Sequence, residues 1–330
     1  MNVVYALLPV VAFVLIVSGG VGLLGWQSLF GVIMPYAAII IFIIGFVYRI
    51  LKWASAPVPF HIPTVAGQQK SLPWIKDNRI ESPSSTIGVS VRMALEVLLF
   101  RSLFRNDRVE LKRSQKLVFS SKKYLWLGGL AFHWSLFLIL FRHLRLFTEP
   151  VPPVVLFTQN IDGVFQLAVP TLFVTDFIIL IALTYLILRR FSSPQIRYIS
   201  LAADYFALFL ICGVAISGVL VRLFYRVDVS AVKELAMGVL SLHPVIPDGL
   251  GLTFYIHLFL VSTLLAYFPF SKLMHGPGVL LSPTRNLQNN SRRQRHINPW
   301  DYPVKVHTYE EWEDDFREAL KKVDLPVERG

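Results

Sequence analysis

The sequence predicts an all-α, polytopic membrane helix bundle of about six transmembrane helices, with a cytoplasmic loop and a C-terminal tail. Three observations favour this fold class. Hydrophobic residues make up 54% of the 330-residue chain. Charged residues make up only 16%, against roughly 25% in an ordinary soluble domain. The apolar residues gather in long runs, and most basic residues lie in alternate connections between those runs. This composition excludes a soluble enzyme, a disordered chain and a disulfide scaffold.

The apolar runs are long enough to cross a bilayer. A helix needs about 20 apolar residues to span a hydrocarbon layer of ~30 Å. Six segments meet this length, and we expect each of them to be a transmembrane helix. They are Val3–Leu24, Leu29–Leu51, Tyr124–Phe147, Gly163–Leu188, Ile199–Phe224 and Leu250–Phe268.

The distribution of Lys and Arg predicts the orientation. The chain has 32 Lys and Arg against 21 Asp and Glu, a net charge of +11. With six spans, 27 of the 32 basic residues fall on one side: 14 in Arg49–Lys123, three in Arg189–Arg197 and ten from Lys272 onward. Because cytoplasmic loops carry the excess of Lys and Arg, we expect a multi-pass protein of the cytoplasmic (inner) membrane with both termini in the cytoplasm. The basic excess therefore implies no nucleic-acid partner.

The spans divide the chain into four parts. We expect residues 1–52 to form an N-terminal two-helix membrane segment and residues 53–122 a cytoplasmic loop with an amphipathic helix at Val89–Arg105. Residues 123–272 form a four-helix membrane domain, and residues 273–330 a cytoplasmic tail. The amphipathic helix lies either on the membrane surface or a partner, or against the bundle itself, and the pattern leaves these alternatives open.

The tail ends in a short predicted helix. Thr308 and Glu311 match a capping box, and Trp312, Phe316 and Leu320 then recur at helical spacing. A lone helix of this length is marginal in water, so its aromatic stripe needs a surface to pack on. The helix is rich in acids, which favours a soluble partner subunit over lipid. We therefore expect a partner-binding helix.

Cysteine usage limits the redox chemistry that this chain can carry. Its single cysteine, Cys212, lies in an apolar run. An iron–sulfur cluster needs several thiolates, and a C-x-x-C-H site for c-type haem is absent. Any redox chemistry must therefore use histidine ligands or a bound organic cofactor.

Four of the eight histidines lie in or at the ends of two spans. His133 and His143 belong to the third span, and His257 and His275 lie in and just after the sixth. An ionisable group at membrane depth is costly, so each one needs a partner or a function. For a single histidine, a hydrogen bond between helices is explanation enough. Two pairs on two helices make that explanation weaker.

Antiparallel packing of the third and sixth spans would bring these histidines together in two pairs. His143 lies level with His257 near the outer surface, and His133 lies towards His275 near the cytoplasm. Two neutral imidazoles that face each other suit a six-coordinate haem iron. A separation of ten residues rises ~15 Å, however, whereas one of eighteen rises ~27 Å. The inner pair can be level only if the sixth span bends, and Pro269 marks the place for a kink.

The paired spacing His-x9-His and His-x17-His resembles the di-haem cytochrome b (gamma) subunit of respiratory nitrate reductase. The last four spans, residues 120–280, carry this resemblance, which makes residues 123–272 a nitrate reductase gamma-like four-helix di-haem domain. The extra N-terminal spans and the long loop are more similar to the membrane cytochrome b subunit of the sulfite-reduction-associated electron-transfer complex.

The resemblance implies cofactors, ligands and partners. It implies two b haems, the outer on His143 and His257 and the inner on His133 and His275. It implies that menaquinol is oxidised to menaquinone near the outer face and that electrons pass inward to a cytoplasmic iron–sulfur (heterodisulfide reductase-like) subunit, in sulfur or sulfite respiration. Other membrane and periplasmic redox subunits would complete the complex.

The arginines beside the outer histidine are candidate cofactor-binding residues. Arg142 and Arg145 flank His143 and would pair with haem propionates or orient the quinone. Extension of their side chains to lipid headgroups is the alternative. The lysine that serves the quinone in nitrate reductase has no counterpart, because Asp162-Gly163 stands there.

One competing function stays open. The chain could be a haem-free transporter or scaffold subunit whose intramembrane histidines handle protons. Acids at membrane depth are scarce, with Asp176 and Asp204 as the main ones, and no repeat or pair of broken helices is evident. The sequence therefore favours an electron-transfer subunit of a quinol-oxidising oxidoreductase complex.

Overall fold

A computed structural model describes residues 2–56, 67–111, 117–163, 171–282, 284–293 and 306–328. The first half of the chain forms α1 (Asn2–Gly22), η1 (Leu29–Ile33), α2 (Met34–Ala54), α3 (Thr86–Leu99), α4 (Arg101–Phe104), β1 (Asp107–Leu111), β2 (Leu117–Ser121), α5 (Lys123–His143), η2 (Leu144–Leu146) and α6 (Pro153–Asp162). The second half forms α7 (Val174–Ser192), α8 (Pro194–Ile199), α9 (Ala202–Val219), η3 (Leu220–Phe224), α10 (Val229–Leu240), α11 (Leu252–Tyr267), η4 (Phe268–Phe270), η5 (Lys272–Met274), α12 (His275–Leu280) and α13 (Tyr309–Lys322).

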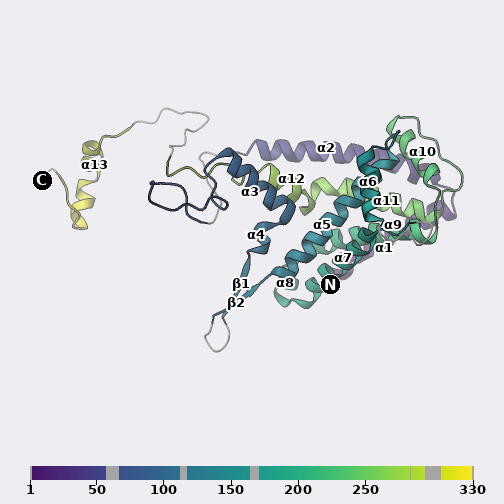
Figure 1. The fold of residues 1–330 in the computed structure, drawn as a ribbon, viewed down its shortest axis with the longest axis horizontal. Helices are drawn as coiled ribbons and strands as arrows, with labels where there is room; N and C mark the ends of the chain where they lie inside the picture. The colour runs from purple at the N-terminus through teal and green to yellow at the C-terminus, as the bar shows by residue number, and fades with distance from the viewer. Residues whose placement is uncertain are drawn as a thin grey trace.

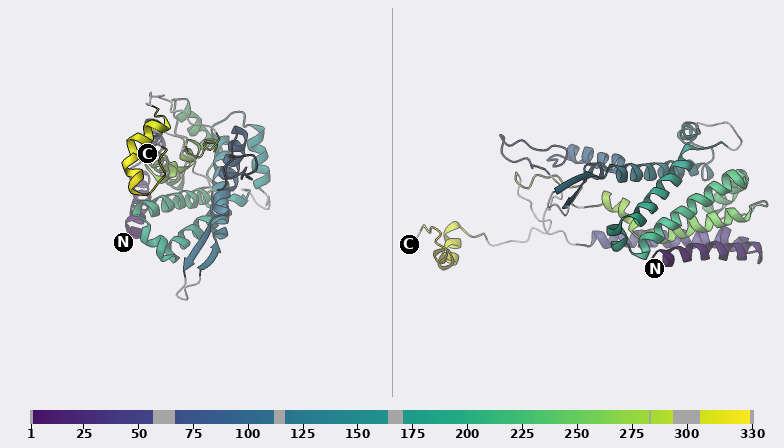
Figure 2. Two further views of the ribbon diagram at one scale, coloured as in Figure 1. Left: turned by 90° about the vertical axis from the view of Figure 1, so that its left-hand side faces the viewer. Right: turned by 90° about the horizontal axis from the view of Figure 1, so that it is seen from below.

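The long helices pack side by side into one bundle (Figures 1 and 2). α5 packs on α7, α7 on α9, and α9 on both α1 and α11, while α2 packs on the other side of α11. Five helical segments of the described chain are long and apolar enough to cross a membrane. They are Asn2–Gly22, Leu29–Ala54, Lys123–Leu146, Ala202–Phe224 and Leu252–Phe270. The predicted fold class, an all-α polytopic membrane bundle, is confirmed.

The fourth predicted span differs from its expected bounds. The sequence placed it at Gly163–Leu188, but α7 begins at Val174. The residue before it, Phe173, is extended with φ −102° and ψ 134°. The Asp162 carboxylate accepts a hydrogen bond from the Thr175 N–H at 3.0 Å, and this contact satisfies one of the free N–H groups at the start of α7. α7 lies between α5 and α9 and, with the five segments above, gives six helices in the bundle.

The connection between α2 and α5 contains structure that the sequence did not predict. β1 and β2 pair as an antiparallel hairpin, with Asp107 opposite Ser121. The predicted amphipathic helix Val89–Arg105 is divided into α3 and α4 at Phe100. This helix pair packs against α5, so it covers the bundle, which was one of the alternatives left open.

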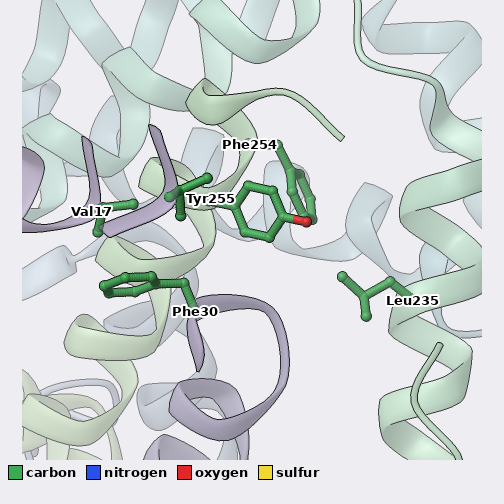
Figure 3. Close-up of a cluster of buried hydrophobic side chains, with 6 residues drawn as sticks. Val17, Phe30, Leu235, Phe254 and Tyr255 are labelled. Carbon is green, nitrogen blue, oxygen red and sulfur yellow. The ribbon is translucent and has the colours of Figure 1, made fainter. Parts of the chain in front are cut away.

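The two ends of the bundle differ, and we name them by what lies there. The "tail end" holds α3, α4, α8 and α12, and the "turn end" holds α6, α10 and the turn between α1 and α2 (Figure 1). An apolar core near the turn end ties α1, η1, α10 and α11 together. Figure 3 shows Tyr255 of α11 between Phe30 of η1 and Leu235 of α10.

The sixth span breaks where its proline predicts. α11 ends at Tyr267, and η4 with Pro269 follows as a 3-10 turn. Ser271 is extended, with φ −110° and ψ 175°, and its hydroxyl then caps η5 through the Leu273 N–H. α12 starts afresh at His275, so the helical spacing from α11 no longer fixes the direction of that side chain.

The tail packs on the loop region before it continues to α13. The Asn289 N–H donates to the Pro83 carbonyl at 2.7 Å, and the Arg285 guanidinium pairs with Glu96 of α3 at 3.3 Å. α13 itself stands apart from the bundle in Figure 1 and in the right-hand view of Figure 2. Its predicted capping box is present, since Thr308 and Glu311 exchange side chain-to-backbone hydrogen bonds.

The contact between α5 and α7 is close enough to test by a single methyl group. A Cβ at Gly128 would lie 2.5 Å from Cδ1 of Tyr185, so Gly128→Ala forces the ring or the helix to move. We expect this variant to lower the free energy of unfolding in detergent by about 1–3 kcal/mol, as over-packing typically does. In the control Gly19→Ala, nothing lies within 4 Å of the new Cβ. An equal loss in the control would contradict the close α5–α7 contact.

Candidate functional site

Two imidazole rings lie at the turn end of the bundle. His143 is the last residue of α5, and His257 lies in the second turn of α11. The two rings are close enough to interact electrostatically. Gly218 of α9 faces the His257 ring, and a Cβ there would lie 3.1 Å from Cε1. Glycine at this position therefore leaves the space that the imidazole occupies.

A second pair of imidazoles lies at the tail end. His133 comes from the middle of α5 and His275 from the start of α12. Their ring centroids are 5.9 Å apart, and the ring planes are nearly perpendicular at 88°. A metal held by two opposed imidazoles needs metal–nitrogen bonds of about 2 Å, which puts the ring centres about 6 Å apart. The observed separation fits one metal ion between the two rings.

Hydrogen bonds at three of the rings fix which nitrogen carries the proton. Each bonds to a backbone carbonyl through Nδ1: His133 to Gly129 at 2.7 Å, His143 to Ile139 at 2.7 Å and His275 to Lys272 at 2.9 Å. A carbonyl oxygen only accepts, so Nδ1 is the protonated nitrogen in each neutral ring. Nε2 then keeps its lone pair, as a metal ligand requires, and the carbonyl orients the ring.

In His257, a serine hydroxyl takes the place of the carbonyl as the partner of Nδ1. Its Nδ1 lies 2.9 Å from the Ser217 hydroxyl oxygen, and that hydroxyl lies 3.0 Å from the Val214 carbonyl. The single hydroxyl proton is committed to the carbonyl, so the oxygen accepts from the imidazole N–H. All four rings therefore have Nδ1 protonated and Nε2 available.

The number of ligands decides which kind of metal centre suits these residues. Among the described residues, no group of three or more His, Cys, Asp or Glu could hold a metal ion. A zinc or non-haem iron site needs at least three protein ligands. A haem iron needs only two, because the porphyrin supplies the other four. The donor set of two imidazoles at each end thus fits haem.

Arg142, next to His143, belongs to a buried ion cluster. The side chain is 6% exposed and lies between two carboxylates, 3.2 Å from Asp162 and 2.8 Å from Asp176. Thr175 completes the cluster by donating its hydroxyl to Asp162 at 2.6 Å. The cluster joins the ends of α5, α6 and α7, and it compensates a guanidinium that would be costly at this depth.

More positive charge surrounds the cluster than the two acids balance. The Arg222 guanidinium lies 4.0 Å from the Phe173 ring centroid, and Arg142 lies 3.6 Å from the same centroid. Arg145 is half-buried and close enough to Arg222 to interact with its charge. Three guanidiniums thus stand beside two carboxylates near His143. Among the described residues, Arg142 Nη1 is buried without a hydrogen-bond partner.

These contacts add residues that the sequence analysis did not assign. It named Arg142 and Arg145 but not the partners that hold Arg142, although a buried arginine requires a nearby acid. Ser217 and Gly218 give no sequence signal of their own, because their role depends on α9 packing against α11. Of the remaining histidines, His243 and His307 are loop residues, and His61 and His296 lie outside the described residues.

The family of the chain follows from its similarity to known proteins. The profile of the nitrate reductase gamma subunit family matches residues 89–295, well over half of the chain. The chain belongs to the nitrate reductase gamma subunit family. This match confirms the resemblance found in the histidine spacing. It begins within α3, so most of α3, all of α4 and all four paired histidines lie inside the family region, whereas α1 and α2 precede it.

Two known proteins are similar to this chain over most of their length. The "Hdr-like menaquinol oxidoreductase cytochrome b-like subunit" of Archaeoglobus fulgidus is 46% identical over 281 residues, which cover 83% of each chain. The protein of the same name from Archaeoglobus profundus is 42% identical over 275 residues, 81% of each chain. The similarity to these subunits thus extends over more of the chain than the family region.

The buried ion cluster predicts a stability effect. Asp176→Asn leaves the Arg142 charge with less compensation, so we expect the free energy of unfolding to fall by about 3–5 kcal/mol. The control is Glu149→Gln, which breaks the ion pair with Lys233, where the Glu149 side chain is 68% exposed. An exposed pair contributes about 0–1 kcal/mol. Equal losses in denaturant unfolding would contradict a structural role for the cluster.

Proposed function

We propose that this chain is a membrane cytochrome b subunit that oxidises menaquinol near the outer face. It passes electrons through two b haems to a cytoplasmic iron–sulfur partner. One observation carries the proposal: α5 and the α11–α12 segment present two histidine pairs, one at each end of the bundle, and every Nε2 is available as a ligand. The printed name of the Archaeoglobus relatives, a menaquinol oxidoreductase subunit, supports the substrate.

The ligands follow from the pairs. His143 and His257 hold one haem, and His133 and His275 hold the other. A haem bound between each pair supplies reversible one-electron chemistry at its iron. The residues of this chain orient the four rings through hydrogen bonds at Nδ1 and leave Nε2 available for ligation. The ten-residue separation along α5 spaces the two sites by ~15 Å.

The proposed orientation sets the side of the membrane that each histidine pair faces. We place the tail end in the cytoplasm, because 27 of the 32 basic residues lie on that side. The turn end, with His143 and the Arg142 cluster, then faces outward. Menaquinol oxidised there releases its two protons outside while its two electrons move inward, so the step is electrogenic. Arg142 and Arg145 favour anionic propionates or a quinone oxygen beside His143, since the cluster has more guanidiniums than carboxylates.

The acids at membrane depth speak against the transporter alternative. Asp176 pairs with Arg142, and Asp204 pairs with Lys272 at 2.7 Å. A carboxylate that carries protons must lose and regain its charge, and a fixed cation next to it opposes that change. The protonated Nδ1 groups of the paired histidines are held by carbonyls or a serine.

The tail supplies a candidate contact for the iron–sulfur partner. α13 carries six acids and three bases in a chain of net charge +11. Tyr309, Trp312 and Phe316 follow one another along one face, with neighbouring ring centroids 5.8 and 5.6 Å apart, and are 53%, 42% and 50% exposed. We propose that this face packs on the cytoplasmic subunit, as acids disfavour the anionic membrane surface. The heterodisulfide reductase-like nature of that subunit, a role in sulfur or sulfite respiration, and further membrane and periplasmic redox subunits belong to the same proposal.

Haem content tests the ligand assignment. In protein purified with haem supplied, we expect two b haems in the wild type and the loss of about one in His143→Ala and in His133→Ala, since one ligand cannot hold a low-spin six-coordinate iron. Reduced-minus-oxidised spectra and haem extraction measure this. His243→Ala removes a loop histidine and should keep both. Unchanged haem in both ligand variants would refute the assignment, and no b-type absorbance in the wild type would refute the function.

Partner binding tests the role of α13. We expect Trp312→Ala with Phe316→Ala to reduce co-purification of the iron–sulfur subunit by roughly tenfold or more, because buried aromatic residues dominate interfaces. Haem content and the haem spectrum should stay unchanged. The control, Val323→Ala, removes an exposed apolar residue just beyond the helix. Full retention of the partner by the double variant would show that α13 is not its contact.

A further inference from the structure

Phe100 has an unusual backbone conformation at the joint between α3 and α4. Its φ of 49° and ψ of 47° lie in the left-handed region, which a residue with a bulky side chain rarely adopts. The Phe100 N–H bonds to the Glu96 carbonyl at 3.1 Å, and its carbonyl accepts from the Phe104 N–H at 3.1 Å. Glycine is the usual residue in such a position, because it has no Cβ. The presence of phenylalanine here requires a contact that uses its ring.

Two tryptophans of α5 hold this joint against the bundle. The indole N–H of Trp126 donates to the Leu99 carbonyl at 2.7 Å, and that of Trp134 donates to the Leu98 carbonyl at 2.9 Å. Both acceptors lie in the last turn of α3, where carbonyls lack a partner within the helix. The end of α3 is therefore fixed to α5 on both sides of His133 in the sequence.

The Phe100 ring packs edge-on against His133. The two ring centroids are 4.9 Å apart, and the planes make an angle of 84°. Phe132 lies 4.9 Å from the same imidazole, and His275 lies 5.9 Å from it. Phe132 is the chain neighbour of His133, whereas Phe100 comes from the connection at the tail end. The joint between α3 and α4 thus lies against the His133 ring of the tail-end pair.

We propose that Phe100 is a positioning residue for the tail-end histidine pair. Its ring holds the plane of the His133 imidazole and keeps water away from that ring. The inference rests on the proposed function, because its consequence is the redox behaviour of the haem held by this pair. The strained backbone at Phe100 brings a ring from the α3–α4 joint against His133, in addition to the α5 rings beside it.

The charge of the haem iron predicts the direction in which its reduction potential changes when the Phe100 ring is removed. Oxidised haem iron carries one more positive charge than reduced iron. An apolar, water-poor surrounding disfavours the more charged state and so raises the reduction potential. Removing the Phe100 ring admits water beside His133 and frees the imidazole to rotate. The reduction potential of the tail-end haem should then fall, and the haem at His143 and His257 should not change.

Two ring deletions in the same helix pair separate this role from general stability. Phe100→Gly removes the ring and suits the left-handed backbone. Phe104→Ala removes a ring that instead packs edge-on against Trp126, with the ring centroids 4.9 Å apart, and alanine suits a helix. Phe100→Leu serves as a second variant that keeps an apolar side chain. The tail-end haem is identified as the one lost in His133→Ala.

The test is a redox titration of the haem-loaded protein, with the low-spin electron paramagnetic resonance signals as a second readout. Those signals depend on the angle between the two imidazole planes. We expect Phe100→Gly to lower the tail-end midpoint potential and shift that signal, Phe100→Leu to do so by less, and Phe104→Ala to change neither. Wild-type behaviour of both Phe100 variants, or an equal change in Phe104→Ala, overturns the inference. A wild type without haem overturns the proposed function and this inference with it.

Discussion

The cost of an unpaired polar group inside a bilayer is the constraint on which this structure depends. Water is absent from the hydrocarbon layer, so each ionisable side chain there must find its partner within the protein. In each of the four histidines, one of the two ring nitrogens has such a partner. Each satisfies Nδ1 with a carbonyl or a serine, and none has a described hydrogen bond to Nε2. A bundle that only hid its histidines would not repeat the same half-satisfied arrangement at both ends.

The same constraint explains the differences between the two ends. At the turn end, Arg142 needs two carboxylates to be tolerated, and these fix the ends of three helices beside His143. At the tail end, the helix break at Pro269 and the strained joint at Phe100 bring groups to His133 that straight helices would not deliver. The rigid features of the fold therefore concentrate around the two imidazole pairs.

Much of this arrangement could be predicted from the sequence. Apolar run length and the positions of Lys and Arg predict the helices, and the proline between His257 and His275 predicts the bend. The spacing of the histidines predicts the pairs. Side-chain contacts between distant segments have no corresponding sequence pattern. The hydrogen bonds between Asp162 and Thr175, which accompany the late start of α7, are side-chain contacts that hydropathy does not encode. The ring of Phe100 reaches His133 only because two tryptophans fix the end of α3.

The β1–β2 hairpin and the packing of the tail on α3 also could not be predicted from the sequence. Both lie outside the apolar spans, where periodicity is weak and local propensity decides little.

The central claim, that two histidine pairs each hold a haem, concerns the spans themselves. An experimental density map of the purified, haem-supplied protein tests it most directly. We expect two planar macrocycles, with each iron bonded to a pair of Nε2 atoms, from His143 and His257 and from His133 and His275. Imidazole pairs in direct contact, with no macrocycle between them, would contradict it.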